Sequence, residues 1–157
     1  MFNILKINSK APNFDITGSQ NNTINQYKLS DFEEKWTILF FYSGNFMDFC
    51  DKQLVEFQNN LKEFEQLNTT VLSCSTDSPH SHIAFSNILG GIEYPMLSDI
   101  HHSVCIDYNV FVDETATALP SIFIINQGGI LKWYQVSDEK TSFSMQEILR
   151  ILKVLQS

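Results

Sequence analysis

Cys50 is the residue whose type and position point most directly to chemistry, and it lies in the stretch FYSGNFMDFCDKQLVEF at residues 41–57. An apolar run ends before this cysteine, and apolar residues at helical spacing follow it. A cysteine in the first turn of a helix lies beside free backbone N–H groups and the positive end of the helix dipole, which favour a thiolate. The position therefore indicates a reactive thiol. The alternative is a small buried apolar side chain, as most free cysteines are.

The charge of the chain excludes several classes of partner. The 157 residues carry a formal net charge of −8, and Arg150 is the single arginine. No basic stripe is available to follow a phosphate backbone, so we expect neither nucleic acid nor a membrane as a partner. The apolar runs are far shorter than the roughly 20 residues that a membrane-spanning helix needs.

The cysteines and the N-terminus indicate a cellular compartment. Cys50, Cys74 and Cys105 are odd in number and irregular in spacing, which fits neither a disulfide scaffold nor a zinc site. The N-terminal stretch MFNILKINSK lacks the features of a signal peptide. We therefore expect free thiols, no bound metal and a cytoplasmic protein.

The elements that must position Cys50 follow from the apolar patterns, which predict one α/β domain over residues 1–157. Continuous β-branched and aromatic runs predict buried strands, and spacings of three or four predict helices. We expect strands at 37–42, 69–76, 121–126 and 130–136, after a hairpin or loop within 11–30. Helices are expected over 54–67, from 79 to about 89, from a cap at 98–99 to about 109, and from a capping box at 144–147. This order predicts a thioredoxin-like fold: a central mixed sheet flanked by helices, with an N-terminal hairpin extension.

A family resemblance extends over nearly the whole chain. The chain resembles the peroxiredoxins, the alkyl hydroperoxide reductase and thiol-specific antioxidant family. The similar segments are Ala11-Pro12-Asn13-Phe14, TILFFYSGNFMDFC, Gln53 in an E/Q position, VLSCSTDSPHSHIAF, YPMLSD, Tyr108-Asn109-Val110 and SIFIINQGGIL.

The resemblance implies an activity. Cys50 takes the place of the peroxidatic cysteine, whose thiolate attacks hydrogen peroxide or an alkyl hydroperoxide, becomes a sulfenic acid and is reduced by another thiol. No organic cofactor or metal is implied. Because the chain ends at Ser157 without a Val-Cys-Pro tail, we expect the one-cysteine type, with a thioredoxin-like protein or a small thiol as external reductant. A homodimer is also compatible with the resemblance.

The positions that support the cysteine depart from the family pattern P-x-x-x-T-x-x-C with a distant arginine. Ser43 stands in the proline position, Met47 in the threonine position, and Pro120 where the arginine is usual. A thioether cannot donate a hydrogen bond, so Met47 cannot replace the threonine. Asp48 and Asp51 are expected to oppose ionisation of the thiol.

Several other residues are candidates for supporting roles. Ser43, Asn45 and Gln53 could donate hydrogen bonds near the thiol. Pro120 resembles the cis-proline that faces the cysteines of thioredoxins, but the second cysteine of a C-x-x-C motif is missing after Cys50.

The other two cysteines and the histidines have simpler interpretations. Cys74 and Cys105 are expected in the core, with a resolving role as the alternative. His82 matches a structural histidine of the family, and the remaining histidines suggest no shared metal site. The second hypothesis for the whole chain is a diverged, weakly active or inactive member that acts as a redox sensor or a partner-binding module.

Overall fold

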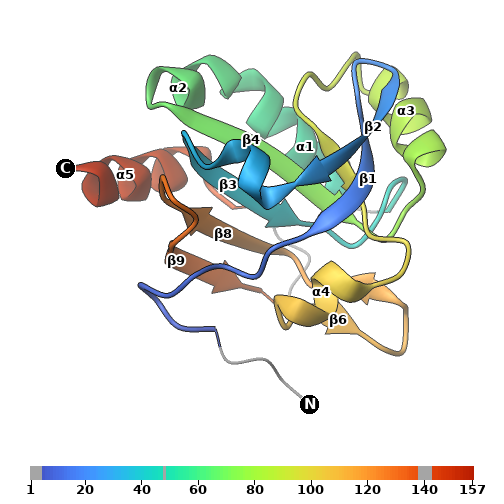
Figure 1. The fold of residues 1–157 in the computed structure, drawn as a ribbon. Helices are drawn as coiled ribbons and strands as arrows, with labels where there is room; N and C mark the ends of the chain where they lie inside the picture. The colour runs from blue at the N-terminus through green and yellow to red at the C-terminus, as the bar shows by residue number, and fades with distance from the viewer. Residues whose placement is uncertain (1–4, 48, 138–142) are drawn as a thin grey trace.

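The computed structural model describes residues 5–47, 49–137 and 143–157. Its main feature is a seven-stranded mixed sheet in the order β2-β1-β5-β4-β3-β8-β9 (Figure 1). The strands are β1 (Asp15–Gln20), β2 (Thr23–Lys28), β3 (Trp36–Phe41), β4 (Thr69–Ser75), β5 (Met96–Ser98), β6 (Phe111–Val112), β7 (Thr117–Ala118), β8 (Ser121–Ile125) and β9 (Leu131–Val136). The helices are a short 3-10 helix η1 (Leu29–Phe32), then α1 (Cys50–Asn59), α2 (Leu61–Gln66), α3 (Pro79–Ile88), α4 (Ser103–Asp107) and α5 (Met145–Gln156).

The centre of the sheet consists of the strands that the continuous apolar runs predicted. β3 pairs in parallel with β4 and antiparallel with β8, and β4 pairs in parallel with β5. All five residues of β8 are buried, as are five of the six residues of β3, because helices and loops cover both faces of the sheet. The predicted mixed sheet and the N-terminal hairpin β1–β2 are confirmed.

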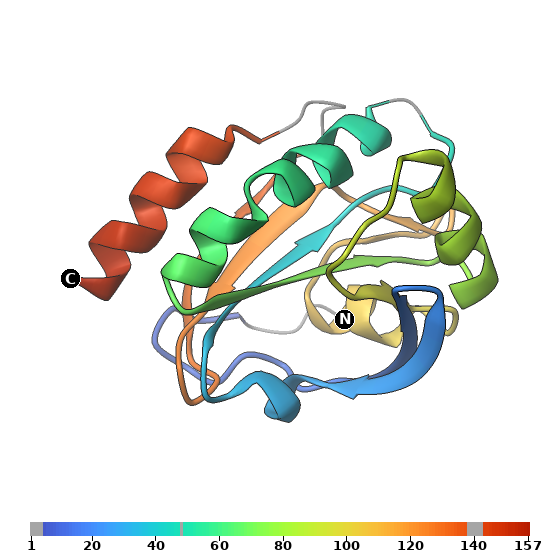
Figure 2. The ribbon, with the colours of Figure 1, turned by 90° about the horizontal axis from the view of Figure 1, so that it is seen from above.

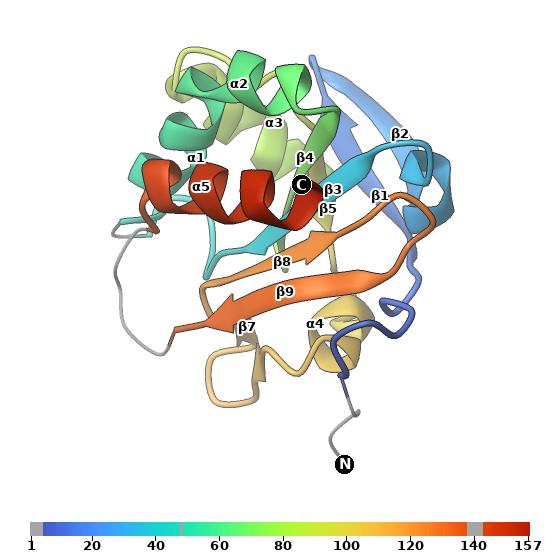
Figure 3. The ribbon, with the colours of Figure 1, turned by 90° about the vertical axis from the view of Figure 1, so that its left-hand side faces the viewer.

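Two hydrophobic clusters lie on opposite faces of the sheet. Helices α1, α2, α3 and α5 cover one face, and α4 lies on the other face beside the N-terminal segment (Figures 2 and 3). Cys50 belongs to the first cluster, whereas Cys74 and Cys105 belong to the second. The sheet therefore separates Cys50 from the other two cysteines.

Three details of the predicted elements were wrong. The apolar helix face expected over 54–67 is divided between two helices, because Asn60 between α1 and α2 has non-helical backbone angles, whereas α1 begins at Cys50, in agreement with the first turn predicted for that cysteine. Ser98 does not cap a helix: it ends the short strand β5, which the sequence analysis missed, and α4 begins only at Ser103. The hairpin of β6 and β7 was also missed. Strands of two or three residues are too short to show an alternating pattern, so they escape pattern analysis.

No helix in the described part of the chain is long and apolar enough to cross a bilayer.

Candidate functional site

Cys50 is the first residue of α1 and follows the loop that leaves the carboxyl end of β3. Its side chain is 7% exposed and packs in the cluster beneath the helices. The carboxyl ends of the parallel strands β3 and β4 lie side by side here, which is where open α/β sheets place their sites. The cysteine lies at the strand–helix junction that the sequence predicted.

The loop before Cys50 has an unusual backbone. Phe46 and Phe49 have φ angles of 63° and 70°, in the left-handed region that bulky residues rarely occupy. Such conformations cost about 1–3 kcal/mol each and concentrate at functional sites. The side chains of both residues are largely exposed, so burial of their rings does not compensate for the strain. The Cys50 N–H donates to the Met47 carbonyl at 3.3 Å, which closes the turn that brings the thiol to the helix start.

Opposing influences set the pKa of Cys50. Burial is the largest and raises the pKa, because the charged thiolate loses its hydration. Hydrogen bonds from the backbone of Gly44 and of Ser43 lower it, and the carboxylates of Asp77 and Asp51 raise it. The net result is a pKa above the ordinary value, so burial and charge outweigh the helix terminus. The effect of Asp51 on the pKa of Cys50 agrees with the sequence analysis, which missed the effect of Asp77. Asp48, the other carboxylate that was expected to oppose ionisation, lies outside the described residues.

A buried network of polar side chains holds the loop that contacts the sulfur. Tyr42 Oη donates to Asn45 Oδ1 at 2.7 Å, and Asn45 Nδ2 donates to Ser81 Oγ at 3.0 Å. Asn45 Nδ2 also lies 3.0 Å from His82 Nδ1. The backbone N–H of Asn45 donates to Asp77 Oδ2 at 2.9 Å. Asn45 was a candidate donor to the site, and the structure places its side chain at the centre of this network.

Two of the other supporting candidates bond elsewhere. The Ser43 hydroxyl donates to the Ala118 carbonyl at 3.3 Å, so its backbone, not its side chain, is directed to the sulfur. Gln53 lies one helical turn after Cys50, and its Oε1 accepts from the Phe143 N–H at 2.6 Å. The buried Nε2 of Gln53 finds no partner among the described residues.

Met47 and Pro120 occupy the positions where the resemblance implies threonine and arginine. Met47 is 42% exposed, and its Sδ is so close to Gly44 that a Cβ on Gly44 would lie 2.9 Å from it. Pro120 directly precedes Ser121, which pairs with Phe41 at the end of β3. The peptide bonds between described residues are all trans, so Pro120 lacks the cis bond of the thioredoxin prolines that it resembles.

Cys74 and Cys105 are fully buried and contact each other on the far face of the sheet. Burial raises the pKa of Cys74, although its hydrogen bond with Cys105 lowers it. The same hydrogen bond, followed by burial, raises the pKa of Cys105. The structure brings neither thiol to Cys50, and both lie in the core as the sequence analysis expected.

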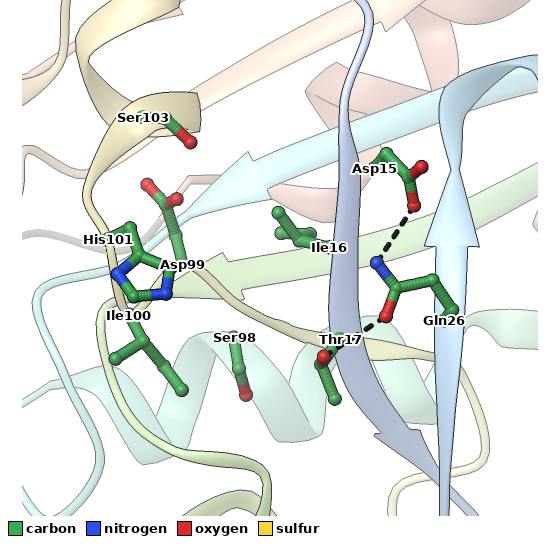
Figure 4. A pocket seen from close by; sticks show the side chains of 9 residues that line it. All are labelled: Asp15, Ile16, Thr17, Gln26, Ser98, Asp99, Ile100, His101 and Ser103. Atoms are coloured by element: carbon green, nitrogen blue, oxygen red, sulfur yellow. Dashed lines mark hydrogen bonds between the residues drawn. The ribbon is translucent and has the colours of Figure 1, made fainter.

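A polar pocket of about 250 Å³ lies between β1 and the segment that connects β5 to α4 (Figure 4). Its walls carry Asp15, Gln26, Asp99 and His101. Asp99 accepts hydrogen bonds from the backbone N–H groups of residues 104 and 105, so this carboxylate anchors α4. Across the described residues, no three His, Cys, Asp or Glu side chains come close enough to hold a metal ion.

The fold and the cysteine at its strand–helix junction define a thioredoxin-like protein with one thiol at the site. The AhpC/TSA family model matches residues 7–134. The mitochondrial thioredoxin-dependent peroxide reductase of Drosophila melanogaster is 34% identical over 158 residues, which cover 97% of this chain and 68% of that protein. Peroxiredoxin tpx1 of Schizosaccharomyces pombe is 35% identical, with 97% and 82% covered.

Solved structures agree with these relatives. The reduced 2-Cys peroxiredoxin of Plasmodium vivax superposes with a TM-score of 0.90 at 30% identity and covers 96% of each chain. AhpC of Enterococcus faecalis superposes with a TM-score of 0.92 at 28% identity, with 98% of this chain and 93% of that chain covered. The chain belongs to the AhpC/TSA family, and it is an oxidoreductase of the peroxiredoxin class of thiol peroxidases.

Proposed function

We propose that Cys50 is the peroxidatic cysteine, which reduces hydrogen peroxide or alkyl hydroperoxides. The observation that carries this proposal is the position of Cys50: of the three cysteines, it is the one at the carboxyl end of the parallel strands with backbone hydrogen bonds to its sulfur. The thiolate attacks one peroxide oxygen and the O–O bond breaks. The products are a sulfenic acid on Cys50 and, after the leaving oxygen takes a proton, water or an alcohol.

We propose the one-cysteine type with an external thiol reductant. The support is geometric, because Cys74 and Cys105 are buried across the sheet from Cys50. Two external thiols would return the sulfenic acid to the thiol, releasing water and forming a disulfide. A thioredoxin-like protein is a candidate because the Drosophila relative is named thioredoxin-dependent, although the Plasmodium vivax structure is that of a 2-Cys protein.

The test is mass spectrometry of the reduced protein after one equivalent of hydrogen peroxide in the presence of a sulfenic-acid trap. We expect the added mass of the trap on the Cys50 peptide. This adduct should be absent in Cys50→Ser and unchanged in Cys74→Ser and Cys105→Ser. Cys50 reacting no faster than a free small thiol would reject the peroxidase role and favour a redox sensor or partner-binding module. A disulfide between Cys50 and Cys105 in the unmodified chain, with more trapping in Cys105→Ser, would instead indicate a resolving role, because a resolving thiol consumes the sulfenic acid.

We further propose that a second copy of the chain covers the apolar surface beside the site. This surface is formed by four exposed side chains, Phe46, Met47, Phe49 and Ile88, at the rim of a hollow of about 300 Å³. Apolar patches of this kind mark interfaces. Sedimentation velocity should show a dimer that Ile88→Ser weakens and that Val154→Ser, a similarly exposed apolar site on α5, leaves intact. Equal effects of the two changes would argue against this interface.

A cytoplasmic location is also our proposal, consistent with three free thiols. Microscopy of the tagged chain tests it, since one relative is mitochondrial.

A further inference from the structure

The hydrogen bonds around His82 determine which ring nitrogen carries the proton. His82 is fully buried, and its Nε2 lies 3.0 Å from the Leu97 carbonyl oxygen. A carbonyl can only accept, so Nε2 carries the hydrogen. In the neutral ring Nδ1 is then an acceptor. Burial lowers the pKa of His82, which favours this neutral form.

The Nδ1 acceptor of His82 faces two polar groups. Asn45 Nδ2 lies 3.0 Å from Nδ1, and Tyr42 Oη lies 3.2 Å from it. One hydrogen of the Asn45 amide group serves His82 and the other serves Ser81. The Tyr42 hydroxyl, at 2.7 Å, donates to Asn45 Oδ1. The side-chain amide of Asn45 therefore has a partner in each direction, and the neutral His82 ring supplies one of them.

Asn45 is covalently next to the groups that act on the sulfur. The backbone of Ser43 and that of Gly44 hydrogen-bond to Cys50 and lower its pKa. The backbone N–H of Asn45 is itself fixed by Asp77, which a hydroxyl of Ser75 also contacts at 2.6 Å. Since Met47 cannot donate and Pro120 replaces the arginine, these backbone groups are the donors that the structure directs to the thiol.

We propose that His82 is a positioning residue for the thiol chemistry: its Nδ1 acceptor holds Asn45, and Asn45 holds the Ser43–Gly44 backbone against the sulfur of Cys50. The inference rests on the proposed role of Cys50. His82 touches neither the sulfur nor the peroxide, so it acts only through Asn45. A mere packing role would need the volume of the ring, whereas this role needs an acceptor at the position of Nδ1.

Acid should release this anchor. A proton on Nδ1 would turn this nitrogen from an acceptor into a donor, so Asn45 Nδ2 would lose its partner there, whereas the oxygen of the Tyr42 hydroxyl could accept the new N–H. The groups around the ring are Tyr42 after β3, Asn45, Ser81 on α3, Asp77 after β4 and the Leu97 carbonyl on β5. Asp77 is the charged member, and its carboxylate favours the protonated ring but does not overcome burial. The anchor is therefore intact at neutral pH and is lost as the pH falls.

The test compares His82→Leu with His82→Asn and measures the alkylation of Cys50 by iodoacetamide against pH, read on the Cys50 peptide by mass spectrometry. Leucine fills the space without an acceptor, whereas the Oδ1 of asparagine can stand where Nδ1 stood. We expect His82→Leu to slow alkylation at pH 8 by about tenfold, since it displaces a donor to the thiolate. His82→Asn should restore the rate to within about threefold of the unmodified chain.

The control is Tyr94→Phe, which removes another buried hydroxyl bond, to the Leu54 carbonyl at 2.7 Å, outside this network. It should destabilise the fold without changing the alkylation profile. Folded Leu and Asn variants with equally slow alkylation, or with unchanged alkylation, would overturn the positioning role. If His82→Leu does not fold, Asn45→Ala must show the same slowing for the proposal to stand. If the alkylation pattern holds but peroxide never oxidises Cys50, the proposed function fails and the positioning role survives.

Discussion

Replacing Met47 by threonine should make Cys50 more reactive toward peroxide. Met47 lies three residues before Cys50, and its carbonyl accepts the Cys50 N–H at 3.3 Å. Its side chain lies against Gly44, whose backbone hydrogen-bonds to the sulfur. A hydroxyl introduced at this position would start close to the thiol and could donate to the thiolate or to the peroxide, which the thioether cannot do.

The size of the effect follows from the exposure of the position. A fully preorganised donor in a dry site changes the rate by about 10²–10³. Residue 47 is 42% exposed, so water competes with the new donor and a smaller gain is expected. A hydrogen bond to a charged group contributes about 1.5–3 kcal/mol, and the lower end of that range is about a tenfold change in rate. We therefore expect the second-order rate constant for hydrogen peroxide to rise about tenfold.

The assay is stopped-flow oxidation of the reduced protein by hydrogen peroxide at pH 7.5, followed by intrinsic fluorescence and confirmed by trapping of the sulfenic acid. Met47→Val is the matched control, because valine has nearly the shape of threonine and no hydroxyl. Both changes remove the same partly exposed thioether, so both should have a similar small effect on stability. Their difference in rate isolates the hydroxyl.

Equal rates for the threonine and valine variants would refute this reasoning. Equal rates above that of the unmodified chain would mean that the bulk of Met47 blocks access to Cys50. Equal rates at the level of the unmodified chain would mean that the backbone groups of Ser43 and Gly44 already provide all the stabilisation that the loop geometry permits.

Four further outcomes are expected. Asp51→Asn should lower the pKa of Cys50 and speed its alkylation about twofold to threefold at low salt, since an exposed charge is screened; Glu65→Gln on α2 is the control. The rate of Cys50 oxidation should rise about tenfold per pH unit from pH 7 to 9, because its pKa is raised and the thiolate is the minor form; a flat profile would contradict the raised pKa. Ser43→Ala should slow alkylation less than His82→Leu does, because the hydroxyl donates to the Ala118 carbonyl and not to the sulfur, and Asn45 still holds the loop. The contribution of neutral His82 to the free energy of unfolding should be complete above about pH 6.5 and decline below it, because the pKa of His82 is lower in the folded protein than in the unfolded chain. Urea titrations at pH 7 and pH 5.5 test this, and His82→Asn should remove the pH dependence that His82 causes.

Most of the fold could be predicted because its central elements are encoded locally. The runs that form β3, β4 and β8 are apolar throughout, and the caps of α3 and α5 appear as Ser78 before Pro79 and as Ser144. The side chains of both serines accept the expected backbone hydrogen bonds. The start of α4 was misplaced because the Asp99 carboxylate reaches residues 104 and 105, beyond the usual spacing of a cap.

The site was only partly predictable because its controlling contacts are distant in sequence. Cys50 could be found from the junction of a strand pattern and a helix pattern. The contact of Asn45 with His82 spans 37 residues, and that of Tyr42 with His82 spans 40. The spacing within any one segment does not indicate that these side chains meet. Likewise, the sequence suggested the side chain of Ser43 as a donor, and only the fold shows that its backbone takes that role.

Burial of Cys50 has two effects that act in opposite directions on its chemistry. It raises the pKa, which reduces the population of the thiolate at neutral pH. It also excludes water, which strengthens each remaining hydrogen bond to developing negative charge. Without a threonine hydroxyl or an arginine at the familiar positions, the second effect depends on backbone groups that no side-chain change can remove directly. Their position depends instead on the anchor at Asn45. The reactivity of this site is therefore controlled by how rigidly the loop is held, more than by the side chains that line it.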